Sequence, residues 1–117
     1  MSSPGSFLLT LDVGHPPRPP AQVEAELGGA LSRVRSSAGL RGIKVVHGYG
    51  SHGRGGSTRD TVRDWAFQFR RHFRGVINGE DYHLFNDLTQ ELRQECGQFD
   101  DPDLGAGNAG ITILWVK

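Results

Sequence analysis

A glycine-rich stretch at residues 47–57 limits how this chain can fold more than any other feature. Five of its eleven residues are glycine. The apolar run at residues 43–46 predicts a buried strand before it, and the helical spacing of apolar residues over 58–73 predicts a helix after it. Glycine allows positive φ angles and a close approach to a ligand, and the first amides of a helix have no partners within it. We therefore expect an anion such as phosphate to bind here.

Two nucleotide-binding motifs nearly fit this loop. Residues 48–53 match the dinucleotide fingerprint G-x-G-x-x-G, but the third glycine does not open a helix, and no strand ending in an acid follows about twenty residues later. Residues 50–57 match G-x-x-x-x-G-K-[ST], except that Gly56 occupies the lysine position. A small phosphate ligand or nucleotide therefore stays an alternative, and a glycine turn without any ligand is the simplest one.

The remaining pattern predicts one domain in which strands and helices alternate. The 117 residues are enough for a single core, and we expect a flexible tail at residues 1–6 followed by a domain at residues 7–117. The predicted strands are 7–13, 42–47, 75–78 and 110–117, and the predicted helices are 21–37, 58–73 and 80–96.

This β-α-β-α-β-α-β order predicts an α/β fold. Strands joined through a helix are usually parallel, with a right-handed crossover. We therefore expect a four-stranded, mostly parallel sheet covered by helices. The last strand is apolar on both faces, which is typical of a central position.

Charge is distributed unevenly although the formal net charge is zero. Residues 41–74 contain eight basic and two acidic residues, whereas residues 80–103 contain eight acidic residues and one arginine. A basic middle segment favours a polyanionic partner. Alternatively, the two segments pack together and neutralise each other.

Composition also bears on the cellular compartment. The single Cys96 cannot form an intrachain disulfide. The first residues lack the basic start and long apolar run of a signal peptide, and no run approaches the length of about 20 apolar residues that a membrane span needs. We expect a cytoplasmic protein with no membrane partner.

Three polar side chains follow the first two predicted strands. Asp12 and His15 come at the end of the first strand, and His47 ends the second. Parallel strands finish at the same edge of a sheet, and ligands of open α/β sheets bind at that edge. These residues should therefore lie together beside the glycine-rich loop.

The same residues, taken in order, resemble the small MutS-related (Smr) domain family over nearly the whole chain. Residues 11–15 look like its L-D-x-H start, with Gly14 inserted so that His15 is displaced by one position. Residues 47–50 look like its H-G-x-G motif, residues 59–65 are similar to its helix motif L-R-x-x-V-x-x-W, and residues 108–117 are similar to its last strand. The resemblance implies a two-layer α/β sandwich that binds DNA or RNA, often with endonuclease or nicking activity.

Three functions follow as hypotheses: an endonuclease, a nucleic-acid-binding module without catalysis, and a small phosphate-ligand or nucleotide-binding protein. For cleavage, His47 is the first candidate for acid and base catalysis, Asp12 would orient it or hold a metal, and His15 would be a second proton-transfer group. The alternative is that His47 only holds the loop in shape. The metal requirement is unknown, although a weakly held magnesium shared with the substrate phosphate would suit the single carboxylate of Asp12. The predicted phosphate-binding residues are Gly48, Tyr49, Gly50, Ser51, His52, Arg54, Gly55, Gly56, Ser57, Arg59 and Arg63.

Overall fold

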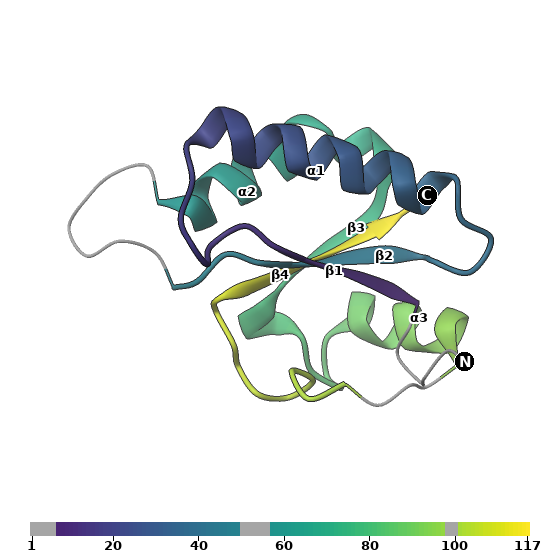
Figure 1. Ribbon diagram of the computed structural model, residues 1–117. Helices are drawn as coiled ribbons and strands as arrows, with labels where there is room; N and C mark the ends of the chain where they lie inside the picture. The colour runs from purple at the N-terminus through teal and green to yellow at the C-terminus, as the bar shows by residue number, and fades with distance from the viewer. Residues whose placement is uncertain (1–6, 50–56, 98–100) are drawn as a thin grey trace.

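The computed structural model describes residues 7–49, 57–97 and 101–117. The predicted tail at residues 1–6 and most of the glycine-rich loop lie outside these ranges. The described elements follow the predicted β-α-β-α-β-α-β order (Figure 1), which is confirmed. They are β1 (Leu8–Asp12), α1 (Pro20–Arg35), β2 (Gly42–Val46), α2 (Thr58–Gln68), β3 (Phe73–Asn78), α3 (Asp87–Cys96) and β4 (Ile111–Val116), with short 3-10 helices η1 (Arg70–His72) and η2 (Gly79–Asp81).

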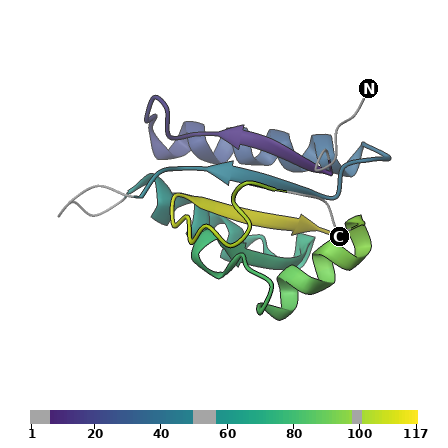
Figure 2. The same cartoon turned by 90° about the horizontal axis from the view of Figure 1, so that it is seen from below.

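The four strands form one mixed sheet in the order β1-β2-β4-β3. β1 and β2 are parallel, whereas β4 runs antiparallel to both of its neighbours. The prediction of a mostly parallel sheet is therefore wrong. It treated α3 as a crossover, but α3 leads away from the end of β3 and residues 101–110 return to the same end, so β4 starts where β3 finishes (Figures 1 and 2).

The predicted two-layer sandwich also needs correction, because helices cover both faces of the sheet. α1 and α2 lie on one face, and α3 with residues 101–110 lies on the other (Figure 1). The second face is held by polar contacts as well as apolar ones: Lys44 on β2 donates to Asp103 at 2.9 Å, and the Tyr82 hydroxyl donates to Asp101 at 3.0 Å. The apolar pattern of the sequence does not predict how residues 101–110 pack, because this segment contains few apolar residues.

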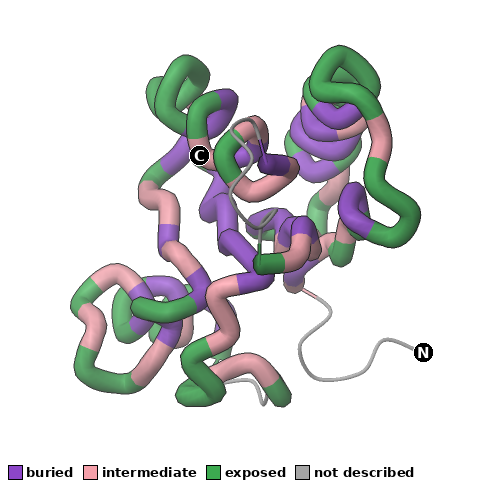
Figure 3. The backbone as a smooth tube through the Cα atoms, turned by 90° about the vertical axis from the view of Figure 1, so that its left-hand side faces the viewer, coloured by how far each residue is buried: buried purple, intermediate pink, exposed green. Residues whose placement is uncertain are grey.

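An apolar core fills each side of the sheet. β4 is buried at all six positions, so its predicted central place is confirmed. Figure 3 shows buried backbone running through the middle of the molecule, with exposed segments outside. The α1/α2 side packs Leu27, Val62 and Trp65 against Ile43 and other strand residues, and the α3 side packs Leu92 and Cys96 against Ile113.

α2 ends earlier than predicted. Its last residue is Gln68, and Phe73, the last residue of the predicted helix, begins β3 instead. Phe73 is buried in the core on the α1/α2 side, and its ring centre lies 6.0 Å from that of Trp65. An apolar residue at a helix end satisfies a helical and a strand pattern equally well, so periodicity alone did not separate them.

None of the helices in the described ranges is long and apolar enough to cross a membrane.

Candidate functional site

The site is built at one edge of the sheet, which we call the carboxyl edge: the ends of β1, β2 and β3 and the start of β4. Asp12 pairs with Val46 in the register of β1 and β2, and Val46 pairs with Ile111. His47 and Gly48 continue from β2, and both of their amides donate to the carbonyl of Gly110. The expected convergence of Asp12 and His47 at one edge is therefore present.

Asp12 organises the turn that leaves β1. Its Oδ1 accepts hydrogen bonds from the amides of Gly14 and His15 at 2.9 and 3.0 Å. The His15 ring faces the same carboxylate, with Nδ1 3.1 Å from both oxygens. Desolvation opposes ionisation of Asp12, but the Gly14 amide and His15 outweigh it and lower the pKa of the carboxyl. His15 therefore contacts Asp12 although it is displaced by one position from the motif.

Gly14 is required by the close packing of this turn. A β-carbon at this position would lie 2.8 Å from the backbone carbonyl group of His47, which is closer than side-chain contacts allow. The residue that interrupts the family-like spacing therefore lets the end of β1 lie directly against the end of β2.

The Asp12–His15 pair is open to solvent. The side chains of His15 and Asp12 are 65% and 43% exposed. An ionised carboxylate only accepts hydrogen bonds, so Nδ1 of His15 carries the hydrogen in this contact and, in the neutral ring, Nε2 has a free lone pair. This arrangement suits an acid–base group that acts on a bound molecule.

His47 has a different environment, since it is only 3% exposed. Its Nδ1 lies 2.7 Å from the carbonyl oxygen of Gly48, and its Nε2 lies 2.8 Å from Oγ1 of Thr112 on β4. A carbonyl only accepts, so Nδ1 carries the hydrogen and the Thr112 hydroxyl donates to Nε2 of the neutral ring. Both ring nitrogens are used within the protein.

Arg63 and Glu80 extend this network to the surface. Nε of Arg63 donates to Oγ1 of Thr112 at 3.1 Å, and its two terminal nitrogens donate to the carboxylate of Glu80 at 2.8 and 3.2 Å. The guanidinium lowers the pKa of Glu80. We call the set Glu80, Arg63, Thr112 and His47 the closed network, because each polar side chain in it has a partner.

Burial lowers the pKa of His47. Desolvation is the main cause, and the positive charges of Arg63 and Arg59 add to it, while the hydrogen bond to Gly48 opposes it. The neutral ring is therefore the form that the fold stabilises.

The glycine-rich loop is described only at its two ends. Gly48 has a positive φ of 81°, a conformation that favours glycine, and Tyr49 is 68% exposed. Ser57 is the N-cap of α2, and its side chain accepts a hydrogen bond from the Asp60 amide at 3.1 Å. The predicted phosphate-binding residues Gly50, Ser51, His52, Arg54, Gly55 and Gly56 lie outside the described residues.

One face of α2 extends the site; Arg59 and Arg63 on it are predicted phosphate-binding residues, whereas Phe67 and Arg70 were not predicted. Arg59, Arg63, Phe67 and Arg70 follow one another at intervals of four, four and three residues, which places them on one side of the helix and its continuation. Phe67 is 66% exposed, and Cζ of Arg70 lies 4.3 Å from the centre of its ring. We call these four residues the α2 face; helical spacing of arginines could have revealed it.

A groove of about 250 Å³ runs beside the α2 face. It lies between α2 and β3, which is an edge strand of the sheet. Its walls are mainly apolar, and Asn78 at the end of β3 contributes an amide. The groove connects the carboxyl edge with the exposed ring of Phe67.

Charge pairing between the basic and acidic segments is limited. Lys44 pairs with Asp101 and Asp103, and Arg63 pairs with Glu80. Among the described residues, no carboxylate lies within ion-pairing distance of Arg41, Arg59, Arg70, Arg71 or Arg74. Most of the positive charge of the middle segment is thus not neutralised by the acidic one.

The described residues contain no group of three or more histidine, cysteine or acidic side chains that could hold a metal ion. At the carboxyl edge Asp12 is a carboxylate on β1, and its Oδ1 already accepts two amide hydrogen bonds. These residues do not form a preassembled metal site.

Comparisons with known proteins do not assign this chain to a family. No model of a known protein family matches the chain, and a search of curated proteins found no match. The similarity to Smr domains therefore stays a prediction from the sequence motifs.

Proposed function

We propose that this chain is a nucleic-acid-binding domain of the Smr type, which holds DNA or RNA along the α2 face. The observation that carries this proposal is the composition of the face: three arginines and an exposed phenylalanine at helical spacing, beginning beside the glycine-rich loop. Over the eight residues from Arg59 to Phe67 the α-helical rise is about 12 Å, so this face is long enough to contact more than one phosphate.

Phosphate contacts supply the affinity in this arrangement. Arg59 has no carboxylate partner among the described residues, and it is the second residue of α2, in the first turn after the Ser57 cap. The positive end of a helix and a free guanidinium both favour a phosphate there. Arg63 joins only when a phosphate competes with Glu80 for its guanidinium.

Phe67 and Arg70 favour contact with an unstacked base. Aromatic rings and arginine planes are the surfaces on which bases of single strands stack. The adjoining groove is mainly apolar, and Asn78 offers an amide donor and acceptor for a base edge. These features favour single-stranded or locally opened nucleic acid over a closed duplex.

A second function, phosphodiester cleavage, is favoured by the open Asp12–His15 pair. His15 would take a proton from a water molecule through Nε2 while that water attacks phosphorus, and Asp12 would stabilise the imidazolium. The leaving oxygen would take a proton from solvent water as its bond to phosphorus breaks, and the imidazolium would return its proton to solvent. We assign His47 to the scaffold, because its buried ring has no free nitrogen for such a transfer.

Binding is tested by measuring the affinity for single-stranded and duplex DNA and RNA over a series of salt concentrations. We expect log K to fall as log salt rises, and Arg59→Ala to reduce that slope. Phe67→Ala should weaken single-strand binding about tenfold or more, given typical stacking energies. Phe85→Ala is the matched control, since Phe85 is exposed on the opposite side of the sheet, before α3.

The outcome also separates the alternatives. Equal binding by the parent and the Phe67→Ala and Arg59→Ala variants would overturn the proposal for the α2 face. Competition by mononucleotides as strong as by oligonucleotides would instead favour a small phosphate ligand. Cleavage that survives Asp12→Asn and His15→Ala would remove the pair from the reaction.

A further inference from the structure

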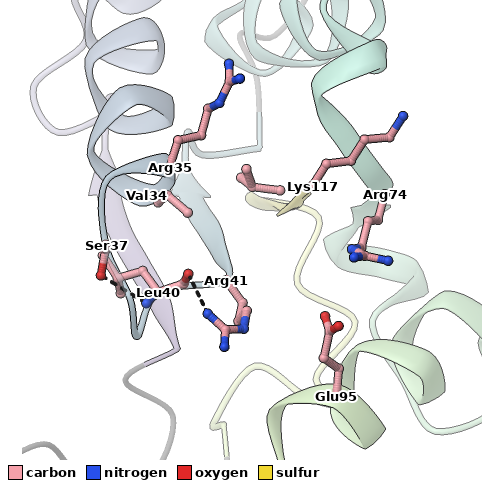
Figure 4. A pocket seen from close by; sticks show the side chains of 9 residues that line it. Val34, Arg35, Ser37, Leu40, Arg41, Arg74, Glu95 and Lys117 are labelled. Carbon is pink, nitrogen blue, oxygen red and sulfur yellow. Dashed lines mark hydrogen bonds between the residues drawn. The ribbon is translucent and has the colours of Figure 1, made fainter.

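A second basic site lies at the end of the molecule opposite the carboxyl edge. A pocket of about 240 Å³ opens where α1, the start of β2, the start of β3 and the end of β4 meet. Its lining includes one acidic side chain, that of Glu95 on α3. It also includes four cationic side chains, those of Arg35, Arg41, Arg74 and Lys117. Figure 4 shows Arg41 and Arg74 on either side of Glu95, with the side chains of Arg35 and Lys117 directed away from it.

The positive charge of this pocket is not neutralised. Among the described residues no carboxylate lies within ion-pairing distance of the four cations. Glu95 accepts a hydrogen bond from the indole nitrogen of Trp115 at 2.9 Å, which occupies one of its oxygens. The pocket therefore has an excess of cations over acids and a carboxylate that is already engaged.

Two of the arginines are held in place by contacts that leave donors free. Nη1 of Arg41 donates to the carbonyl oxygen of Ala38 at 2.9 Å, which leaves its other terminal nitrogen available as a donor. Nη1 of Arg35 donates to Nδ1 of His72 at 3.3 Å. Held guanidinium groups lose less side-chain entropy when they bind an anion.

Helix ends do not account for this cluster. Cations commonly stabilise the C-terminal end of a helix, and Arg35 stands in the last turn of α1. Arg41 precedes β2, Arg74 belongs to β3 and Lys117 follows β4, so these three have no such role. Four separate segments bring their charges to one pocket.

We propose that this pocket binds a phosphate group. Guanidinium groups present paired donors that match phosphate oxygens, and the apolar side chains of Val34, Leu40 and Val116 limit the access of water to part of the pocket. The phosphate comes either from a nucleic-acid backbone or from a small phosphorylated molecule. The site is separate from the α2 face and does not depend on it.

The indole N–H of Trp115 reports on this site, and that of Trp65 in the α1/α2 core is the internal reference. In a titration of the ¹⁵N-labelled protein with inorganic phosphate, we expect the Trp115 signal to shift in a saturable way and the Trp65 signal to stay. Arg41→Ala with Arg74→Ala should weaken this binding about a hundredfold, at about tenfold for each charge-assisted contact. The control, Arg33→Ala with Arg71→Ala, removes the same charge from exposed positions outside the pocket.

Three results distinguish the possibilities. If an oligonucleotide also shifts Trp115, and its affinity falls in the pocket variant but not in the control, the phosphate is that of a nucleic-acid backbone. If inorganic phosphate shifts the Trp115 signal and an oligonucleotide does not, the ligand is a small phosphorylated molecule. This conclusion does not depend on whether the Arg59→Ala variant supports nucleic-acid binding at the α2 face. An unmoved Trp115 signal, or equal losses in the pocket variant and the control, would overturn the proposal.

Discussion

His47 and His15 follow the ends of neighbouring strands, yet one is closed within the protein and the other is open. His47 has both ring nitrogens bonded and belongs to the closed network with Thr112, Arg63 and Glu80. His15 has one nitrogen against Asp12 and an exposed ring. A histidine in a motif is therefore not an acid–base group by position alone; its free nitrogens decide what it does.

This difference divides the carboxyl edge into two parts. The closed network joins the end of β2, α2, β4 and η2, so it holds α2 in place at Arg63. The open part, Asp12 and His15, meets solvent and is free to meet a ligand. We expect changes in the first part to act on stability and changes in the second to act on chemistry.

The largest effect is expected for Thr112→Val. The substitution keeps the shape of a fully buried residue but removes the oxygen shared by His47 and Arg63. Leaving these groups without a partner should lower the free energy of unfolding by about 2 to 3 kcal/mol. Urea denaturation measures it, with Thr10→Val, at an exposed position of β1, as the control. Equal stability of the two variants would show that the closed network does not support the fold.

The pH dependence of stability comes next. The lowered pKa of folded His47, against a value of 6.5 without the fold, means that the unfolded chain takes up a proton first as the pH falls. The stabilisation is fully present above pH 6.5 and is lost as the pH falls through the interval down to the folded pKa, by at most about 1.4 kcal/mol per pH unit. Nitrogen-detected NMR should show the Nδ1–H form of His47 at neutral pH. A midpoint for His47 above 6.5 would contradict this.

Glu80→Gln sharpens the comparison by loosening the closed network at its exposed end. The variant frees the terminal nitrogens of Arg63 from a charged partner. On duplex DNA we expect tighter binding and a salt dependence of log K steeper by about 0.9, the contribution of one phosphate contact. Glu91→Gln removes the same charge from an exposed position of α3. If both variants change binding equally, the effect is general charge and Arg63 is not involved.

The smallest effect on stability is expected for His15→Ala. The side chain is exposed and contacts only its own turn, so the free energy of unfolding should change by less than about 0.5 kcal/mol. If the parent cleaves nucleic acid, cleavage should nevertheless be lost while binding is kept. A strongly destabilised His15→Ala variant would show that the open part also serves the fold.

Much of the fold could be predicted from the sequence, because strong local patterns decide it. The apolar spacing in α1 and α2 predicted that both helices exist, and the apolar β4 predicted its central place in the sheet. The direction of β4 could not be predicted, since it depends on residues 101–110, which are held by Lys44 and Tyr82 through contacts between distant segments.

The candidate site was predictable in position but not in its division of roles. Strand order brought Asp12 and His47 together, as expected from the parallel β1 and β2. The partner of His47 is Thr112, 65 residues away and without any motif of its own, so burial of the ring had no local signal. Phe67 was absent from the predicted site because an exposed aromatic residue is recognised only once its surroundings are known.

The central claim is that nucleic acid meets the α2 face while His47 and Thr112 keep their buried hydrogen bond. A titration of the ¹⁵N-labelled protein with a short single-stranded oligonucleotide tests it most directly, by following the amide signals of α2, the arginine side-chain signals and the imidazole nitrogens of His47. We predict the largest shifts at Arg59, Phe67 and Arg70, with His47 remaining in its Nδ1–H form. Shifts concentrated on the His47 ring or on α3, with the α2 face unmoved, would contradict the claim.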